Sequence, residues 1–313
     1  MRCPSLSELP PPPPGKTGWP WTEESPQIDL NTLNSKSWPK ISIVTPSYNQ
    51  GQFIEETIRS ILLQGYPDLE YIIMDGGSKD NSVEIIRKYE PWLSYWVSER
   101  DRGQSHAVNK GFERATGDII AWVNSDDTLE NNCLAAIGNF IVKNPDVDVI
   151  YGNAKIIDAK GEKIAELRTI PFTPKAFLYN TVHIAAQSSV FWRRELFFKV
   201  GMLNEKLRYT MDFELWVKFL ESGAKFGFIR SFLGTYRCHG ESKTFGTESG
   251  GEAECLTIQT VAKVRQRSDY KFWRFLYRIR QLAMLTIQGD IDYIWSRIEA
   301  RLRGQRDYNQ VSK

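Results

Sequence analysis

Residues 41–49 read ISIVTPSYN, and this stretch decides the fold of the 313-residue chain. Its first four residues, 41–44, are mostly β-branched and predict a short buried strand, and the polar run 45–49 follows directly. An amphipathic helix is expected next, because apolar residues recur at helical spacing: Phe53, Ile54, Thr57, Ile58, Ile61 and Leu62. A strand, a polar loop and a helix in this order form the first unit of a parallel βαβ arrangement.

The same alternation continues along the chain to about residue 250. Further strands are expected at 71–74, 95–97, 119–123, 146–157, 163–167 and near 226–232, and helices at 83–89, around 107–115 and near 211–221. This pattern predicts the α/β class over residues 40–250, with a Rossmann-like, mostly parallel sheet flanked by helices.

Two flanking segments differ from this domain in composition. Residues 1–39 are predicted to form a Pro-rich N-terminal arm, whose five consecutive prolines, Pro10 to Pro14, favour polyproline II over helix or strand. Residues 251–313 are predicted to form a basic, aromatic, helical C-terminal extension. In residues 256–313, 12 Lys and Arg stand against 5 Asp and Glu, although the net charge of the whole chain is only +2.

A helix expected in this extension has two distinct faces. One face is apolar and carries Phe272, Phe275, Leu276, Ile279 and Leu282, and another is cationic and carries Arg267, Lys271, Arg274 and Arg278. Two interpretations follow. Either the apolar face packs on the domain and the cationic face is solvated, or the helix lies on an anionic membrane surface.

Composition excludes several classes of protein. A net charge of +2 argues against a dedicated nucleic-acid binder. The first residues lack the apolar core of a secretory signal, and no stretch is long and apolar enough to span a membrane, so a cytoplasmic protein is expected. The four cysteines, Cys3, Cys133, Cys238 and Cys255, show no spacing that suggests a zinc site or a disulfide framework.

Four of the predicted strands end in unusually polar loops: residues 45–49, 75–80, 99–103 and 124–127. Because ligands of parallel α/β sheets bind beyond the carboxyl ends of the strands, these loops are expected to line one site. Their carboxylates would repel one another unless a cation or hydrogen bonds balanced them. Paired carboxylates without cysteine ligands suit a hard divalent ion such as Mg²⁺ or Mn²⁺, and a metal bridging a diphosphate is the simplest interpretation.

The order of these motifs resembles glycosyltransferase family 2, of the GT-A fold, over about residues 40–245. The resemblance is carried by TPSYN at 45–49, DGGSKD at 75–80, NKG at 109–111, TGD at 116–118 and NSDD at 124–127. It implies that a sugar is transferred from a nucleotide-diphosphate sugar to an acceptor hydroxyl with inversion at the anomeric carbon, in polysaccharide or glycoconjugate synthesis. The acceptor would be a saccharide or a lipid-linked saccharide.

The resemblance also implies a donor site. Pro46, Tyr48, Asp75 and Ser78 match the positions that hold the nucleoside, with Asp75 on the base. The full set of expected donor-binding residues is Thr45, Pro46, Tyr48, Asn49, Asp75, Gly77, Ser78, Asp80, Asp101, Lys110, Asn124, Ser125 and Asp126. Residues 124–126 match the metal-binding Asp-x-Asp motif, in which Asp126 is the main ligand and Asp127 its neighbour, and Asn124 replaces the first Asp.

Inversion in one displacement needs a carboxylate that takes the proton of the acceptor hydroxyl. Asp212, in TMDFELW at 210–216, resembles the Asp of the family's Glu-Asp motif and is the expected base, with Glu214 in reserve. Met211 stands where the family has the Glu. The same residues also fit the start of a helix with a buried apolar face.

Two further groups of residues are expected around the reaction. His239 matches the C-terminal metal-contacting His of many GT-A enzymes, and Arg237 and Lys243 beside it would meet phosphate. His183, Gln187 and Trp192 match the acceptor side, where Trp192 either stacks on a sugar or packs in the core.

Two other functions compete with glycosyl transfer. A sugar nucleotidyltransferase also uses an α/β sheet and a divalent ion, but it relies on a Gly-rich basic loop where this chain has residues 45–49. A catalytically silent module that binds nucleotide sugar is suggested by Asn124 and Met211. Binding without turnover of any donor would favour that module.

Overall fold

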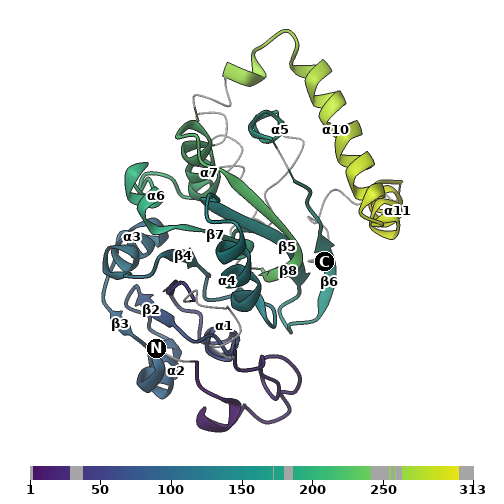
Figure 1. Cartoon of the computed structure of the whole chain (residues 1–313). Helices are drawn as coiled ribbons and strands as arrows, with labels where there is room; N and C mark the ends of the chain where they lie inside the picture. Colours follow the sequence, from purple (N-terminus) through teal and green to yellow (C-terminus); the bar gives the residue numbers. More distant parts are fainter. Residues whose placement is uncertain are drawn as a thin grey trace.

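The computed structural model describes residues 3–28, 38–171, 173–179, 186–240, 254, 258 and 263–302. Its centre is one mixed sheet with the strand order β3-β2-β1-β4-β7-β5-β6, and β8 pairs with β5 (Figure 1). The strands are β1 Ile41–Ser47, β2 Leu69–Asp75, β3 Tyr95–Ser98, β4 Ile119–Trp122, β5 Val149–Ile157, β6 Lys163–Leu167, β7 Val190–Arg193 and β8 Phe226–Arg237. The helices are α1 Ile54–Leu62, α2 Ser82–Tyr89, α3 Gln104–Arg114, α4 Cys133–Lys143, α5 Pro174–Leu178, α6 Arg194–Lys199, α7 Met211–Glu221, α10 Tyr270–Ile287 and α11 Ile291–Leu302.

The expected parallel sheet is confirmed for one half of the observed sheet. Strands β3, β2, β1 and β4 are parallel, and their register aligns Ser47 with Asp75 and Asp75 with Ser98. In the other half, β7 runs antiparallel to both β4 and β5, so this sheet is more mixed than expected. The carboxyl ends of β1, β2 and β3 therefore meet at one rim.

Two apolar cores cover the two faces of the sheet. One includes Ile43, Ile58 and Ile137, from β1, α1 and α4, and the other includes Trp122, Trp192 and Leu215, from β4, β7 and α7. Trp192 is completely buried and its ring lies 5.5 Å from the ring of Trp122. Trp192 is thus a core residue, and of the two interpretations above only packing is correct.

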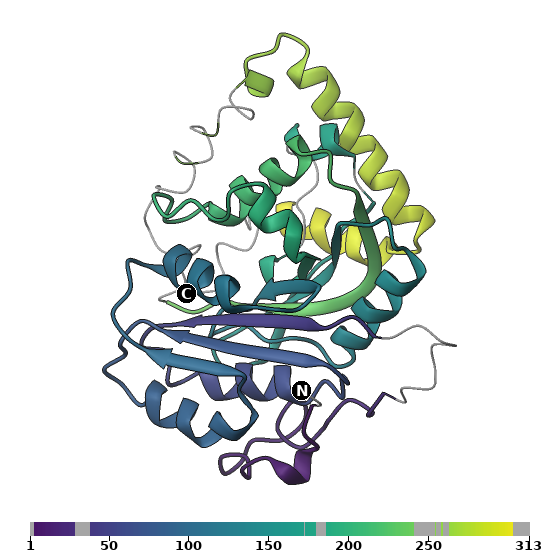
Figure 2. The same cartoon turned by 60° about the vertical axis from the view of Figure 1, so that its left-hand side comes forward.

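The Pro-rich arm packs against the domain, as its position beside α1 in Figure 2 shows. Arg59 of α1 is completely buried and donates hydrogen bonds to the carbonyls of Pro10, Pro20 and Trp21. A buried guanidinium needs such partners, so these contacts fix the arm to α1. Residues 3–28 therefore belong to the body of the domain.

The α10–α11 segment contacts the rest of the chain through aromatic rings and ion pairs. The ring of Tyr179 lies 5.7 Å from Tyr270 and 5.8 Å from Tyr277. At the turn between the helices, the buried carboxylate of Asp290 pairs with Arg168 at 2.6 Å and with Arg230 at 3.2 Å. Helix α10 therefore contacts the rest of the chain through a face other than the predicted apolar one.

The predicted apolar face of α10 is exposed. Phe272 is 59% exposed and Phe275 62%, and Leu276, Ile279 and Leu282 are exposed as well. The prediction that this face packs on the domain is therefore wrong. In the parts of the chain that the structure describes, no helix has both the length and the apolar character needed to cross a bilayer.

Glu70 stabilises the edge of the sheet opposite the rim, and we expect its replacement to lower stability. Its carboxylate pairs with Lys40 at 2.9 Å and accepts hydrogen bonds from the hydroxyls of Ser42 and Thr116. Burial alone would raise the pKa of this group, but these hydrogen bonds outweigh burial and lower its pKa to about 2. The stabilisation is therefore complete above the pKa of the unfolded chain and is lost as the pH falls toward 2.

Glu70→Gln is expected to lower the free energy of unfolding by about 3 kcal/mol at pH 7. Urea unfolding at pH 7 and at pH 3 measures this loss, which we expect to be smaller at the lower pH. Equal stability of variant and wild type at pH 7 would contradict the assignment.

Candidate active site

Asp75 lies at the centre of the rim and is held rigidly. It ends β2, and its carboxylate accepts hydrogen bonds from the hydroxyls of Ser98 at 2.6 Å and Ser78 at 2.5 Å, and from the backbone N–H groups of Gly77 and Ser78. Gly77 has a φ of 81°, a conformation that favours glycine, and this turn brings the two N–H groups onto the carboxylate. Asp75 is thereby fixed at the expected donor site.

The loops after β1 and β2 are joined by side-chain hydrogen bonds. The N–H of Asn49 donates to the Ser78 hydroxyl, and the side-chain oxygen of Asn49 accepts from the N–H of Lys79, each at 2.8 Å. Tyr48 projects from this joined pair of loops and is 58% exposed. The predicted pair of Tyr48 and Asp75 is therefore brought to one rim.

Three predicted donor-binding residues are buried or make hydrogen bonds that join loops and helices. Thr45 is completely buried, and its hydroxyl accepts a hydrogen bond from the Tyr71 hydroxyl. Pro46 is a buried residue of β1. Asp80 accepts hydrogen bonds from Ser82, the first residue of α2, and from the N–H of Gly51, so it joins α2 to the loop after β1. Their effect on a ligand would be indirect.

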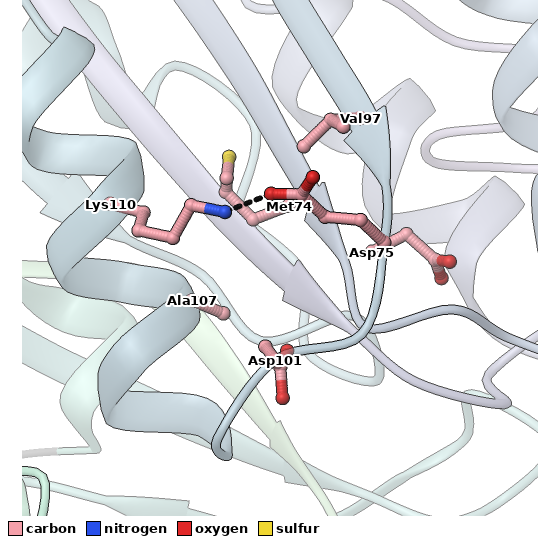
Figure 3. A pocket seen from close by; sticks show the side chains of 7 residues that line it. Met74, Asp75, Val97, Asp101, Ala107 and Lys110 are labelled. Atoms are coloured by element: carbon pink, nitrogen blue, oxygen red, sulfur yellow. Dashed lines mark hydrogen bonds and ion pairs between the residues drawn. The ribbon is translucent and has the colours of Figure 1, made fainter.

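A small pocket beside Asp75 brings together three of the predicted residues (Figure 3). It is lined by Met74, Asp75, Val97, Glu99, Asp101, Ala107 and Lys110. Lys110 of α3 forms an ion pair with Glu99, and Asp101 accepts a hydrogen bond from the N–H of Gly103 at 2.8 Å. The lining of the pocket thus combines three apolar residues with four charged ones.

Two of the three predicted metal ligands, Asp126 and His239, lie side by side. His239 Nε2 lies 3.0 Å from Asp126 Oδ2, and the Asp126 side chain is 21% exposed. Asp127 is buried instead, and its carboxylate accepts hydrogen bonds from the N–H of Arg237 and from the Asn124 amide. Burial, together with the charge of Asp126, raises the pKa of Asp127. Of the two neighbouring aspartates, Asp126 and Asp127, the one with the more exposed carboxylate is therefore Asp126.

Asp126 and His239 fit a divalent ion that would take its other ligands from a substrate. One carboxylate and one imidazole supply only some of the ligands that Mn²⁺ or Mg²⁺ takes, and the remaining coordination positions need further oxygen atoms. Within the described ranges, no group of three or more His, Cys, Asp or Glu residues is arranged to hold a metal. Diphosphate oxygens and water would complete such a site.

Arg237 does not face the rim, so the expectation that it meets phosphate is wrong. Its side chain is completely buried and donates hydrogen bonds to the carbonyls of Asp126 and Asp158. The sequence offered no signal for this, because an Arg before a Gly-containing segment is typical of anion binding as well. Two other predicted residues, Lys243 and His183, lie outside the described residues.

The predicted base lies at the start of α7. Asp212 is half-buried, and its carboxylate accepts a hydrogen bond from the N–H of Phe213 at 2.8 Å. Burial raises the pKa of Asp212. Glu214, the reserve, accepts a hydrogen bond from Asn204 at 3.1 Å and pairs with Lys218 at 3.0 Å.

The first turn of α3 connects the segment of the predicted base to the loop that carries Asp126. The Gln104 amide donates to Asn124 at 2.6 Å, and the neighbouring Ser105 hydroxyl donates to the Met211 sulfur at 3.0 Å. Asn124 is two residues from Asp126, and Met211 precedes Asp212. Two adjacent residues of one helix therefore bring the two predicted catalytic elements together.

Gln187, predicted on the acceptor side, and Glu254 both have structural partners. Gln187 donates a hydrogen bond to the carbonyl of Trp122 at 2.7 Å. Glu254, which sequence reasoning missed, accepts hydrogen bonds from the N–H groups of Arg208, Tyr209 and Thr210 just before α7. No spacing in the sequence predicts this contact.

Known proteins of one family are similar to this chain in sequence. The model of the family described as "Glycosyl transferase family 2" matches residues 42–201. An uncharacterized glycosyltransferase of Rickettsia typhi is 30% identical over 262 residues, which are 80% of this chain and 76% of the relative. One of Nostoc sp. is 27% identical over 292 residues, 87% of this chain and 86% of the relative. The chain spans only 44% of a similar protein of Rickettsia conorii.

Solved structures show the same fold at low sequence identity. The structure of S. aureus TarS 1-349 in complex with UDP-GlcNAc is 17% identical, with a TM-score of 0.57 over 79% of this chain and 72% of that one. A mannosyltransferase from Pyrobaculum calidifontis, in complex with GDP-Man and Mn2+, is 16% identical, with a TM-score of 0.54 over 87% of this chain and 83% of that one. The fold is therefore GT-A, and the family match shows that the chain belongs to glycosyltransferase family 2 and is a glycosyltransferase.

Proposed function

We propose that this enzyme transfers a sugar, with inversion, from a nucleotide-diphosphate sugar to an acceptor hydroxyl in polysaccharide or glycoconjugate synthesis. The observation that carries the proposal is the connection, through Gln104 and Ser105, between the loop of Asp126 and the start of α7 at Asp212. A leaving diphosphate and an attacking hydroxyl must both reach one anomeric carbon, so their partners must lie near each other. Two solved structures of the same fold hold UDP-GlcNAc, or GDP-Man with Mn2+, which supports a nucleotide-sugar donor.

On the donor side, Tyr48 would stack on the nucleoside and Asp75 would accept a hydrogen bond from the base. Asp126 and His239 would hold the divalent ion, Mn²⁺ or Mg²⁺. When bound, that ion offsets the negative charge that develops on the departing diphosphate. The exposed ring of Tyr48 and the fixed carboxylate of Asp75 suit these roles, because neither needs to rearrange before the donor binds.

On the acceptor side, Asp212 would act as the general base. As the acceptor oxygen bonds to the anomeric carbon, the bond from that carbon to the diphosphate breaks and Asp212 takes the hydroxyl proton. Burial raises the pKa of Asp212, so its carboxylate binds a proton more strongly than an exposed Asp does. The ion pair and hydrogen bond of Glu214 make it the weaker candidate.

The stereochemistry of the product tests this proposal. UDP- and GDP-linked sugars are incubated with the enzyme, Mn²⁺ and a panel of saccharide acceptors, and the product is examined by NMR. We expect an α-linked donor to give a β-linked product. Retention would contradict the single-displacement mechanism, and nucleotide binding without turnover of any donor would favour the silent binding module.

We further propose that α10 and α11 rest on an anionic membrane surface, where lipid-linked acceptors would be met. Beside the exposed face of α10, Ile287 is 78% exposed, and α11 adds an exposed stripe of Ile291, Trp295, Ile298 and Leu302. An exposed apolar surface of this extent on two neighbouring helices marks an interaction site. The basic flank of α10, with Lys271 and Arg278 exposed, favours a surface of negative charge.

Co-sedimentation with vesicles tests this contact. We expect binding to phosphatidylglycerol-containing vesicles that weakens with salt and with the triple change of Lys271, Arg274 and Arg278 to Gln, since each basic residue contributes about 1 kcal/mol near such a surface. A control variant changes Arg87 and Lys88, exposed on α2, to Gln. Equal binding to neutral vesicles, or self-association through α10 without vesicle binding, would contradict the proposal.

A further inference from the structure

Arg237 links Asp126 and His239, the two proposed metal ligands. It ends β8, two residues before His239, and its guanidinium donates to the carbonyl of Asp126 at 2.7 Å. The same group forms an ion pair with Glu56 of α1 at 3.1 Å and donates to the carbonyl of Asp158 at 3.1 Å. A completely buried charge with partners in three separate segments of the chain has little freedom to move.

Phe53 extends this arrangement to the imidazole. The guanidinium carbon of Arg237 lies 5.0 Å from the centre of the Phe53 ring, and the His239 ring lies 4.7 Å from the same ring. Arg237 therefore supports Asp126 by a hydrogen bond, and it supports His239 both along the chain and through Phe53.

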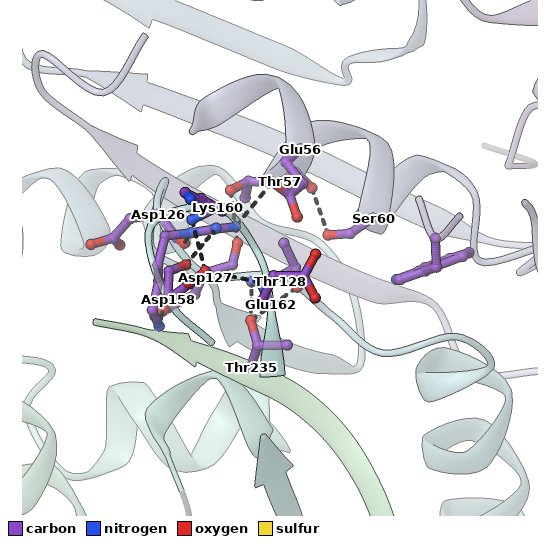
Figure 4. Close-up of polar contacts among 12 residues, drawn as sticks. Glu56, Thr57, Ser60, Asp126, Asp127, Thr128, Asp158, Lys160, Glu162 and Thr235 are labelled. Atoms are coloured by element: carbon purple, nitrogen blue, oxygen red, sulfur yellow. Dashed lines mark hydrogen bonds and ion pairs between the residues drawn. The ribbon is translucent and has the colours of Figure 1, made fainter. Parts of the chain in front are cut away.

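Thr57 of α1 contacts the loop that carries Asp126, independently of Arg237. Its hydroxyl lies 3.0 Å from the carbonyl oxygen of Ser125 and 2.7 Å from that of Asp127. Figure 4 shows Glu56 and Thr57 next to Asp126, Asp127 and Asp158. The sequence placed Thr57 in the apolar stripe of the helix, and it is indeed buried, but its hydroxyl serves the loop.

We propose that Arg237, with Glu56 as its partner, and Thr57 are positioning residues for the metal site. They hold the Asp126 carboxylate and the His239 imidazole where a divalent ion can meet both. This inference rests on the proposed function, because it assumes the metal at Asp126 and His239. Hydrogen-bonding partners behind metal ligands typically contribute a factor of about 10 to 100 in metal affinity.

The test measures Mn²⁺ affinity by electron paramagnetic resonance, with Mn²⁺ alone and with UDP or GDP added. Thr57→Val keeps the shape of the side chain and removes the hydroxyl, whereas Thr57→Ser keeps the hydroxyl. We expect Mn²⁺ to bind about 10-fold or more weakly to Thr57→Val and Glu56→Gln, and nearly normally to Thr57→Ser.

Glu70→Gln serves as the matched control, because Glu70 also belongs to a largely buried ion pair but lies at the opposite edge of the sheet. It should lower stability without changing Mn²⁺ affinity. Normal affinity in both Thr57→Val and Glu56→Gln, or an equal loss in Glu70→Gln, would overturn the inference and leave the proposed function intact. A wild-type enzyme that binds no Mn²⁺ under any of these conditions would contradict the metal site itself.

Discussion

Asp212→Asn is expected to lower kcat by a factor of about 10² to 10⁴, the usual contribution of a general base. The amide keeps the size of the side chain and its contact with the N–H of Phe213, but it cannot take the acceptor proton. In our proposal the donor lies at the ion held by Asp126 and His239, away from Asp212, so the affinity for nucleoside diphosphate should stay near the wild-type value. Steady-state kinetics and nucleotide titration of the same preparation measure both quantities.

Glu214→Gln is the matched control for this change. Glu214 is two residues away on the same helix, and its ion pair with Lys218 makes it a structural residue in our account. The raised pKa of Asp212 adds a second readout, because activity should fall as the pH drops through that pKa, and this dependence should be lost in Asp212→Asn. Near-native transfer by Asp212→Asn, with an inactive Glu214→Gln, would move the base to Glu214.

Asp126→Ala is expected to weaken the binding of nucleoside diphosphate by at least about 10-fold in Mn²⁺, and to make binding the same in Mn²⁺ and in EDTA. The physical reason is charge, since the diphosphate and the rim carboxylates are all negative and repel one another without a cation. Isothermal titration of wild type and variant, each in Mn²⁺ and in EDTA, gives four affinities.

Asp118→Asn is a suitable control for Asp126→Ala, because Asp118 accepts a hydrogen bond from Lys40 at the opposite edge of the sheet. We expect it to bind nucleotide as the wild type does. Four equal affinities for wild type and Asp126→Ala would reject the metal assignment.

Local patterns in the sequence predicted the parallel half of the sheet and the rim. The strands β1 and β2 combine β-branched residues with polar loops, and in-register parallel pairing then places Ser47, Asp75 and Ser98 side by side. Helix α7 was also predicted, because its apolar residues recur at helical spacing. These features depend on residues that are close in the chain.

Features that depend on distant contacts were missed or misassigned. Strand β7 was not predicted, since its four residues acquire a strand partner only when β4 and β5 lie on either side. Asp126 and Asp127 look alike in sequence, and the buried carboxylate of Asp127 accepts a hydrogen bond from the N–H of Arg237, 110 positions away. The exposure of the apolar face of α10 likewise depends on which residues of the domain meet the helix.

The most direct test of the central claim is a thermal-shift measurement on the wild-type enzyme with UDP, GDP, dTDP or CDP, each in Mn²⁺ and in EDTA. A ligand at 100 times its Kd stabilises the native state by about 2.7 kcal/mol, which raises Tm by several degrees. We predict such a rise for at least one nucleotide in Mn²⁺, and a much smaller one in EDTA. No rise with any nucleotide in Mn²⁺, or an equal rise in EDTA, would contradict metal-dependent donor binding.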